Sequence, residues 1–137
     1  MNSLLRVSGR NHLGLILMAE LASRYGNDVW LSLSELAGRM RISDGYLEEI
    51  ARALKEADLI EGRKGPGGGY RLRVKPKDIS IESVLVALEG PLAMVDCQAS
   101  EKGCPVEAGC SSKSLWDFLH KDVVKTLRQT TLADVLS

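Results

Sequence analysis

Apolar residues recur every three or four positions near the start of the chain, the spacing that puts them on one face of a helix. Over residues 7–23 this repeat predicts a core helix that begins at Ser8 or Gly9, because serine and glycine are favoured at helix N-termini. A turn-forming Gly-Asn-Asp sequence follows, and residues 29–31 are predicted as a short strand. The apolar positions of the helix are Leu13, Ile16, Leu17, Met18, Leu21 and Ala22.

Two further helices with a tight break between them give the middle of the chain a helix-turn-helix outline. The first is predicted over residues 34–40, and the second runs from a cap at Ser43 or Asp44 to about residue 57. Residues 41–42 form the break. The apolar stripe of the second helix is Leu47, Ile50, Ala51 and Leu54.

A basic hairpin is predicted directly after these helices. Residues 59–63 and 70–74 have strand character, and the Gly-Pro-Gly-Gly-Gly sequence at 65–69 is typical of the turn between them. A helix-turn-helix with such a hairpin is a winged helix, which we expect over residues 1–79. A phosphate-binding loop would instead need Gly-Lys-Ser or Gly-Lys-Thr leading into a helix, and this glycine run leads into Tyr-Arg-Leu-Arg-Val.

The remaining residues, 80–137, are predicted to form two more helices around a cysteine-containing loop at 91–113. Ser80 caps the first helix, over residues 81–89, and the second is long, from near residues 112–114 to about residue 129. Its apolar positions form a seam that we expect to mediate dimerisation, and the alternative is packing on the first helix of the same chain. The seam consists of Leu115, Phe118, Leu119, Val123 and Leu127.

The end of the chain carries a helix-capping pattern. Thr131 is followed three residues later by Asp134, which is the spacing of a capping box. We therefore expect a short terminal helix. The fold class predicted for the whole chain is mainly α with a small β-hairpin, a winged helix-turn-helix plus a long C-terminal dimerisation helix.

The charge is balanced overall but unevenly distributed. The 137 residues contain 18 lysines and arginines and 18 aspartates and glutamates; residues 39–77 carry ten basic against six acidic residues, and residues 78–137 carry five against nine. We therefore expect a polyanion to bind the middle of the chain. No apolar run is long enough to cross a membrane and no signal-peptide pattern opens the sequence, so we expect a cytoplasmic protein without membrane contact.

All three cysteines lie within one short stretch, at Cys97, Cys104 and Cys110. The residues between them are polar, small or turn-forming, so this stretch has no apolar core of its own. In a reducing cytoplasm, clustered thiols are more often ligands than disulfides, and an odd number cannot pair completely. The pattern indicates a metal ion or an iron-sulfur cluster. The alternative is three unrelated small residues in a surface loop.

The predicted recognition helix and hairpin carry the candidate DNA contacts. Glu48 lies in the first turns of that helix, where a carboxylate can accept a hydrogen bond from cytosine N4 in the major groove. At least one basic residue of the hairpin should border the minor groove while others contact phosphates, which makes binding depend strongly on salt. Neutralising a phosphate-contacting Arg71 or Arg73 should lower the slope of log affinity against log salt by about one. An enzyme is disfavoured because no nucleophile-base pair is apparent. The candidate contacts are Ser43, Gly45, Tyr46 and Glu48 on the helix and Arg63, Lys64, Arg71 and Arg73 on the hairpin.

These motifs closely resemble the IscR and NsrR family of bacterial transcription regulators. The resemblance rests on RKGPGGGYRL in the wing, on ISDGYLEEIARALKEADLI before it, and on the three cysteines followed by SLWDFL. It runs in order over nearly the whole chain, with Gly45 and Lys64 in place of a serine and an arginine of the family pattern. It implies a homodimer in which the long C-terminal helices cross, and a [2Fe-2S] or [4Fe-4S] cluster bound by the cysteine loop.

The resemblance leaves the fourth cluster ligand open. In the IscR pattern a histidine stands three residues after the last cysteine, and here that residue is Lys113, whose protonated ammonium group is a poor ligand. In the NsrR pattern an acidic residue near the start of the partner's first helix serves, and the corresponding residue here is His12, whose imidazole is a competent iron ligand. The alternative is that His12 contacts DNA or water. His120 is expected to be a solvated surface residue.

The expected function is that of a homodimeric repressor that binds a palindromic operator in double-stranded DNA. Its DNA affinity would be controlled by a cluster that senses iron, redox or nitric oxide status, with Cys97, Cys104, Cys110 and His12 as the metal ligands. Two alternatives stay open: a regulator with zinc on the same thiols, and a winged-helix regulator that needs no cluster.

Overall fold

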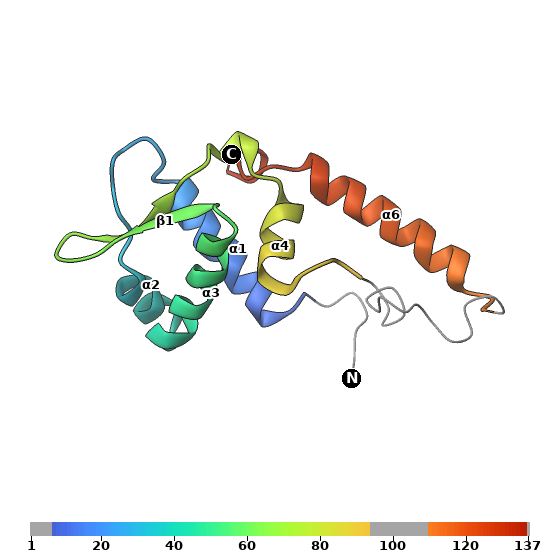
Figure 1. Ribbon diagram of the computed structural model, residues 1–137, viewed down its shortest axis with the longest axis horizontal. Helices are drawn as coiled ribbons and strands as arrows, with labels where there is room; N and C mark the ends of the chain where they lie inside the picture. Colours follow the sequence, from blue (N-terminus) through green and yellow to red (C-terminus); the bar gives the residue numbers. More distant parts are fainter. Residues whose placement is uncertain (1–6, 94–109, 137) are drawn as a thin grey trace.

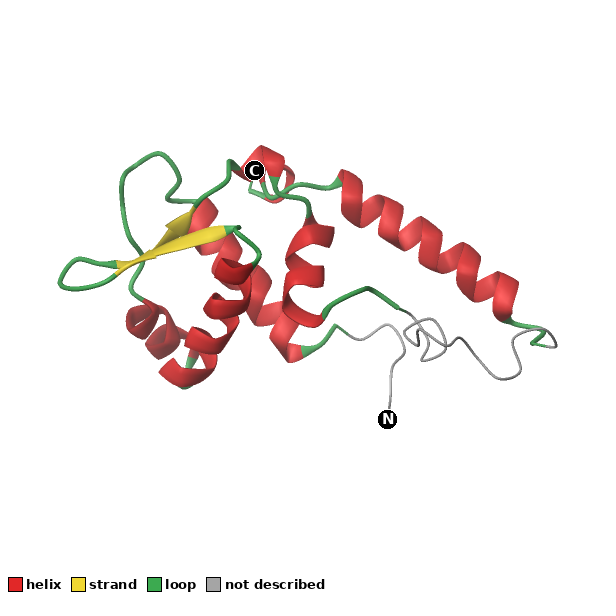
Figure 2. Ribbon diagram, viewed as in Figure 1, coloured by secondary structure: helices red, strands yellow, loops and turns green. Residues whose placement is uncertain are grey.

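The computed structural model describes residues 7–93 and 110–136 of the chain. Figure 1 shows the winged-helix elements gathered around α1 and α3, with α6 extended to one side of them. In chain order the described elements are α1 (Gly9–Ala22), α2 (Leu33–Met40), α3 (Asp44–Glu56), β1 (Ile60–Arg63), β2 (Gly69–Leu72), the 3-10 turn η1 (Pro76–Asp78), α4 (Ile81–Glu89), α6 (Lys113–Gln129) and the 3-10 turn η3 (Ala133–Val135). The described part is mainly helical with one antiparallel hairpin (Figure 2), which confirms the predicted fold class.

Serine caps set the starts of α1, α3 and α4. The hydroxyls of Ser8, Ser43 and Ser80 each accept a hydrogen bond, at 3.0–3.1 Å, from the backbone N–H three residues later. Each cap satisfies a donor that the first turn of a helix leaves without a partner. The predicted starts of these three helices are confirmed.

The break between α2 and α3 is a single left-handed residue. Arg41 has φ 56° and ψ 44°, and the N–H of Ile42 donates back to the carbonyl of Ala37 at 3.1 Å. Across the break, the Ser34 hydroxyl donates to Asp44 Oδ2 at 2.7 Å. These bonds fix the angle between the two helices, and the predicted helix-turn-helix is confirmed.

The hairpin also pairs with the loop before α2 through the backbone of Leu31. Its N–H donates to the Tyr70 carbonyl at 2.8 Å, and the Tyr70 N–H donates to the Leu31 carbonyl at 2.9 Å. This contact requires Gly69, whose φ is 145° and where a Cβ would clash with the Leu31 carbonyl oxygen. The predicted strand over residues 29–31 is wrong, because Leu31 alone pairs, as an isolated bridge to β2.

The core lies between α1, α3 and α4, with α2 and the hairpin closing its sides. Gly14 allows α1 and α4 to approach, because a Cβ there would clash with Leu88 Cδ1. Because residues of α4 belong to this core, α4 packs together with the helices of the winged helix. The predicted boundary between two domains at residue 79 stays a prediction. The fully buried side chains include Leu17, Met18, Leu36, Leu47, Ile50, Leu54, Val84 and Leu132.

The helix α6 packs against α4, with Leu127 against the core, and extends to one side of the other elements (Figure 1). Arg128 of α6 forms a two-pronged ion pair with Glu82 of α4, with both N–O distances at 3.0 Å. No residue of α6 is buried, and Leu115 and Phe118 of the predicted seam are 53% and 63% exposed. No described helix is long and apolar enough to cross a membrane.

The segment after α6 returns to the start of α4. The N–H of Ile81 donates to the Thr130 carbonyl at 2.9 Å, and the N–H of Leu132 donates to the Ile79 carbonyl at 3.0 Å. We call this pair of bonds the C-terminal clasp. The predicted capping box is confirmed beside it: the N–H of Thr131 donates to the side chain of Asp134 at 2.9 Å, and the Asp134 N–H donates to Thr131 Oγ1 at 3.3 Å.

Candidate DNA interface and cysteine site

The N-terminal half of α3 presents the candidate base contacts. Glu48 is exposed, whereas Tyr46 is half-buried and packs against the core. The hydroxyl of Ser43 is occupied by the helix cap. Gly45 is exposed and a Cβ there would meet nothing within 4 Å, so this position leaves open space on the helix.

A contact that the sequence analysis missed connects the wing to this helix. The hydroxyl of Tyr70, on β2, donates to Glu48 Oε2 at 3.2 Å. The two residues are 22 positions apart, so no local sequence pattern links them. Only the place of Tyr70, directly after the glycine turn, marks it in the sequence.

The wing arginines are held by carboxylates of their own chain. Arg71 donates through Nε to Glu61 Oε1 at 2.6 Å and through Nη1 to Asp28 Oδ1 at 2.9 Å. Its guanidinium carbon lies 4.2 Å from the ring centroid of Trp30, a cation-π contact. The hydrogen bond to Glu61 is the main cause that raises the pKa of Arg71 above its ordinary value.

The other wing cations differ in how they are engaged. Arg73 pairs with Asp58 at 2.9 Å. Arg63 lies 5.9 Å from the centroid of Trp30. Neither Arg63 nor Lys64 has an ion-pair partner within residues 7–93 and 110–136. Of the four predicted wing contacts, these two are therefore the ones whose charge is not offset by a carboxylate in the described chain.

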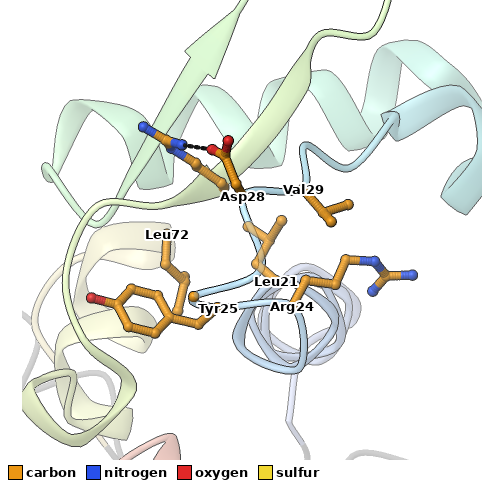
Figure 3. Close-up of a pocket in the computed structure, with 8 residues that line it drawn as sticks. Leu21, Arg24, Tyr25, Asp28, Val29 and Leu72 are labelled. Carbon is orange, nitrogen blue, oxygen red and sulfur yellow. Dashed lines mark hydrogen bonds and ion pairs between the residues drawn. The ribbon is translucent and has the colours of Figure 1, made fainter.

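A shallow pocket of about 220 Å³ lies between the end of α1, the loop after it and β2. Figure 3 shows Leu21, Tyr25, Val29 and Leu72 lining it, with the ion pair of Asp28 at its edge. Its charged lining residues are Arg24, Asp28 and Arg71, and Asp28 and Arg71 are paired with each other, so among the described residues the pocket offers no group poised for catalysis.

Cys110 is the cysteine that the structure describes, and Cys97 and Cys104 lie outside the described residues. Cys110 is half-buried just before α6, with its Sγ 3.4 Å from the hydroxyl of Ser112. That hydroxyl, followed by the backbone N–H groups of Ser112 and Lys113, lowers the pKa of the thiol. Since the thiolate is the form that binds metals, this donor fits a metal or a cluster.

The two candidate fourth ligands lie on different helices, His12 on α1 and Lys113 at the start of α6. His12 is exposed in the first turn of α1, and Lys113 pairs with Asp117 at 2.6 Å. In Figure 1 the start of α6 lies at the end of the molecule away from α1. Within the described part of one chain, no three histidine, cysteine, aspartate or glutamate side chains gather as a metal site.

The expectation for His120 is wrong. Its ring is half-buried, and Nε2 donates to the carbonyl of Leu92 at 2.6 Å. The bond ties α6 to the chain just after α4. The sequence pattern put His120 beside the apolar seam of the helix but gave no indication that the chain leaving α4 would pass there.

Comparisons with known proteins give consistent matches over nearly the whole chain. Residues 7–137 match the Rrf2 family, described as an iron-dependent transcriptional regulator. The protein rrf2 of Nitratidesulfovibrio vulgaris is 32% identical over 132 residues, which cover 96% of this chain and 87% of that protein. The structure of CymR, the global cysteine regulator of B. subtilis, matches with a TM-score of 0.77 and 31% identity over 96% of both chains. The IscR structure from T. potens matches with a TM-score of 0.76 and 32% identity over 96% of this chain and 86% of that one.

Proposed function

Because this chain belongs to the Rrf2 family of transcriptional regulators, which are DNA-binding proteins and not enzymes, we propose that an iron-sulfur cluster on its cysteines controls its binding to DNA. The observation that carries this proposal is the place of Cys110, which lies just before α6 with its Sγ 3.4 Å from the hydroxyl of Ser112. Cys110 ends the stretch that also contains Cys97 and Cys104, so one short segment supplies three thiolates. A bound cluster would supply a centre that responds to iron, redox state or nitric oxide.

The regulator acts as a homodimer on a palindromic operator in this proposal. The exposed seam of α6 supports a partner chain, since Phe118 and Leu115 have little cover within their own subunit. We take residues 1–79 as the DNA-binding part and residues 80–137 as the cluster-binding and dimerisation part. The two copies of α3 would then enter major grooves about 34 Å apart, or a multiple of that distance.

Arg10 offers a route from the cysteine segment to α3. Its Nε donates to the carbonyl of Leu88, near the end of α4, and its Nη1 donates to Glu49 Oε1 of α3, both at 2.9 Å. A movement where α4 leads into the cysteine segment therefore reaches the helix that reads DNA. A difference of about 1.4 kcal/mol between two arrangements changes DNA affinity tenfold.

The two alternatives are a zinc-binding regulator and one that needs no cluster. The similarity to CymR, described as the global cysteine regulator, is the observation that favours a regulator without a cluster. Three thiolates within fourteen residues favour the cluster, because a regulator without a metal gives no reason to gather every cysteine of the chain there.

The test is the optical and Mössbauer spectrum of protein purified without oxygen from iron-replete cells. We expect iron and sulfide in the protein and an absorption band in the visible region. Each of Cys97→Ala, Cys104→Ala and Cys110→Ala should abolish the band, and Ser111→Ala, a neighbouring change without a thiol, should keep it. A colourless protein that holds zinc on the same cysteines would contradict the proposal.

The fourth ligand is tested by His12→Ala. If His12 of the partner subunit completes the site, the variant stays dimeric but its cluster has a shifted spectrum or is lost faster in air. A variant with the spectrum, oxygen stability and DNA affinity of the wild type removes His12 from the site. The ligand would then be Lys113, which would first have to leave Asp117, or a carboxylate or a small molecule from solution.

A further inference from the structure

The side chain of Tyr70 is fixed before it reaches α3. Its backbone is held on both sides by the two hydrogen bonds to Leu31, at 2.8 and 2.9 Å. Its ring lies over Gly62, the residue opposite it in the hairpin, where a Cβ would come within 3.1 Å of Cε1. Gly62 therefore leaves room for the ring, and the ring crosses β1 toward Glu48.

In α3, which the structure describes throughout, no other side chain forms a hydrogen bond or an ion pair with Glu48. It is an exposed side chain with three rotatable bonds, so its carboxylate samples many orientations unless something holds it. The bond of 3.2 Å from the Tyr70 hydroxyl to Oε2 selects one of them. A carboxylate has about four lone-pair sites, so Glu48 can accept this bond and still accept another from a base.

The hydroxyl of Tyr70 stays protonated near neutral pH. Burial, and after it the negative charge of Glu48, raise the pKa of Tyr70 above its usual value, and the positive charge of Arg52 opposes this. Tyr70 is therefore a hydrogen-bond donor, which a carboxylate requires.

We propose that Tyr70 is a positioning residue for sequence recognition, whose hydroxyl holds the Glu48 carboxylate in the orientation that accepts from a cytosine. The inference rests on the proposed function, because it assumes that α3 reads DNA. It adds that the wing determines base choice at a position that the wing does not itself contact. Base discrimination at this position then requires both side chains.

The experiment compares base discrimination by the full-length holoprotein on double-stranded operators from a randomised-site selection. Glu48→Ala should reduce discrimination at one position of each half-site by roughly 5- to 150-fold. Tyr70→Phe keeps the ring over Gly62 and removes only the donor, and it should reduce discrimination at that same position by about three- to tenfold. Tyr25→Phe, an exposed tyrosine in the loop after α1, is the matched control and should change nothing.

Two further measurements separate positioning from a structural role. In the Glu48→Ala background, Tyr70→Phe should have no additional effect on discrimination, because the group that it orients is gone. Without any DNA, Glu48→Gln should lower the pKa of Tyr70 in an absorbance titration, with Tyr70→Phe to identify the signal.

The inference is overturned if Tyr70→Phe keeps the discrimination of the wild type, or if it weakens binding to all sequences equally. It is also overturned if Glu48→Ala leaves base choice unchanged, and the proposed function then stands, since the wild type still binds its operator. Failure of the wild type to prefer any sequence would overturn both.

Discussion

At the scale of single residues, the contact of Gly14 with Leu88 sets how closely α1 and α4 pack. Leu88 is 5% exposed, so its side chain has little space into which to move when a methyl group is added opposite it. Two effects compete in Gly14→Ala: alanine favours the helix by about 1 kcal/mol, and overpacking a core costs about 1–3 kcal/mol. Because the added methyl group would clash directly with Leu88 Cδ1, we expect the cost of overpacking to exceed the gain in helix propensity.

We therefore expect Gly14→Ala to lower the free energy of unfolding by about 1 kcal/mol. Leu88→Ala alone should lower it by about 2–5 kcal/mol, because it leaves a cavity. In the Leu88→Ala background the sign of Gly14→Ala should reverse, since the new methyl group fills part of that cavity. Urea unfolding of the four proteins measures this, and a Gly14→Ala effect of the same sign in both backgrounds would show that the two helices do not meet as described.

Residues whose role is local were predictable from the sequence, and residues with distant partners were not. The caps at Ser8, Ser43 and Ser80 and the capping box of Thr131 each depend on a neighbour three positions away. The partners of Arg71, in contrast, are ten and 43 positions away. The pair with Asp28 forms only once the loop before α2 lies against the hairpin, and the pair with Glu61 depends on the register of β1 against β2, so helical and capping spacings predict neither.

At the scale of elements, the wing divides its positive charges into two kinds. Arg71 and Arg73 each have a carboxylate partner, so a phosphate would have to compete with Glu61, Asp28 or Asp58 for them. Arg63 and Lys64 have no such partner within the described residues. The sequence analysis expected Arg71 or Arg73 to contact phosphate, because the carboxylates that pair with them come from other elements of the fold.

Salt dependence of DNA binding distinguishes these two kinds. Lys64→Gln should reduce the slope of log affinity against log salt by about one, the change expected when one phosphate contact is lost. Arg71→Gln and Arg73→Gln should reduce it by less, because part of their charge is already offset. Lys125→Gln on α6 is the control and should leave the slope unchanged. If no wing variant changes the slope, the wing is not at the DNA.

The boundaries of most described elements follow from the helical repeat and the turn residues. The predicted helix over residues 81–89 coincides with α4, and the long helix predicted to end near residue 129 does so. The strand expected at residues 29–31 failed because a run of β-favouring residues forms a strand only where a partner strand runs beside it. Here β2 meets Leu31 alone.

At the scale of the whole molecule, three of the five seam residues of α6 are exposed, whereas Leu119 and Leu127 are half-buried and Leu127 packs against the core. Phe118, Leu115 and Val123 are 63%, 53% and 43% exposed, although they repeat at core spacing. The alternative, that the seam packs within its own chain, holds for Leu127 but not for these three exposed residues. Burying such a seam between two copies would remove large apolar side chains from water.

A charge placed in the seam tests this assembly. Leu119→Glu should convert the dimer to monomers in sedimentation analysis, because an unpaired carboxylate would have to be buried between the helices. Gln129→Glu adds the same single charge at an exposed position of α6 and should leave a dimer. If Leu119→Glu stays dimeric, the seam does not form the interface.

The C-terminal clasp has a consequence for how this protein can vary in evolution. It joins Ser80 to Thr131, so the polypeptide between them, about 50 residues with the cysteines and α6, begins and ends at one place. Even a doubling of such a loop costs only about 0.6 kcal/mol of closure free energy. Insertions and deletions between α4 and α6 therefore leave the register at Ile79 and Leu132 unchanged. Descendants of this chain can therefore carry a cysteine segment of another length or chemistry while the clasp still joins the two ends of the same winged helix.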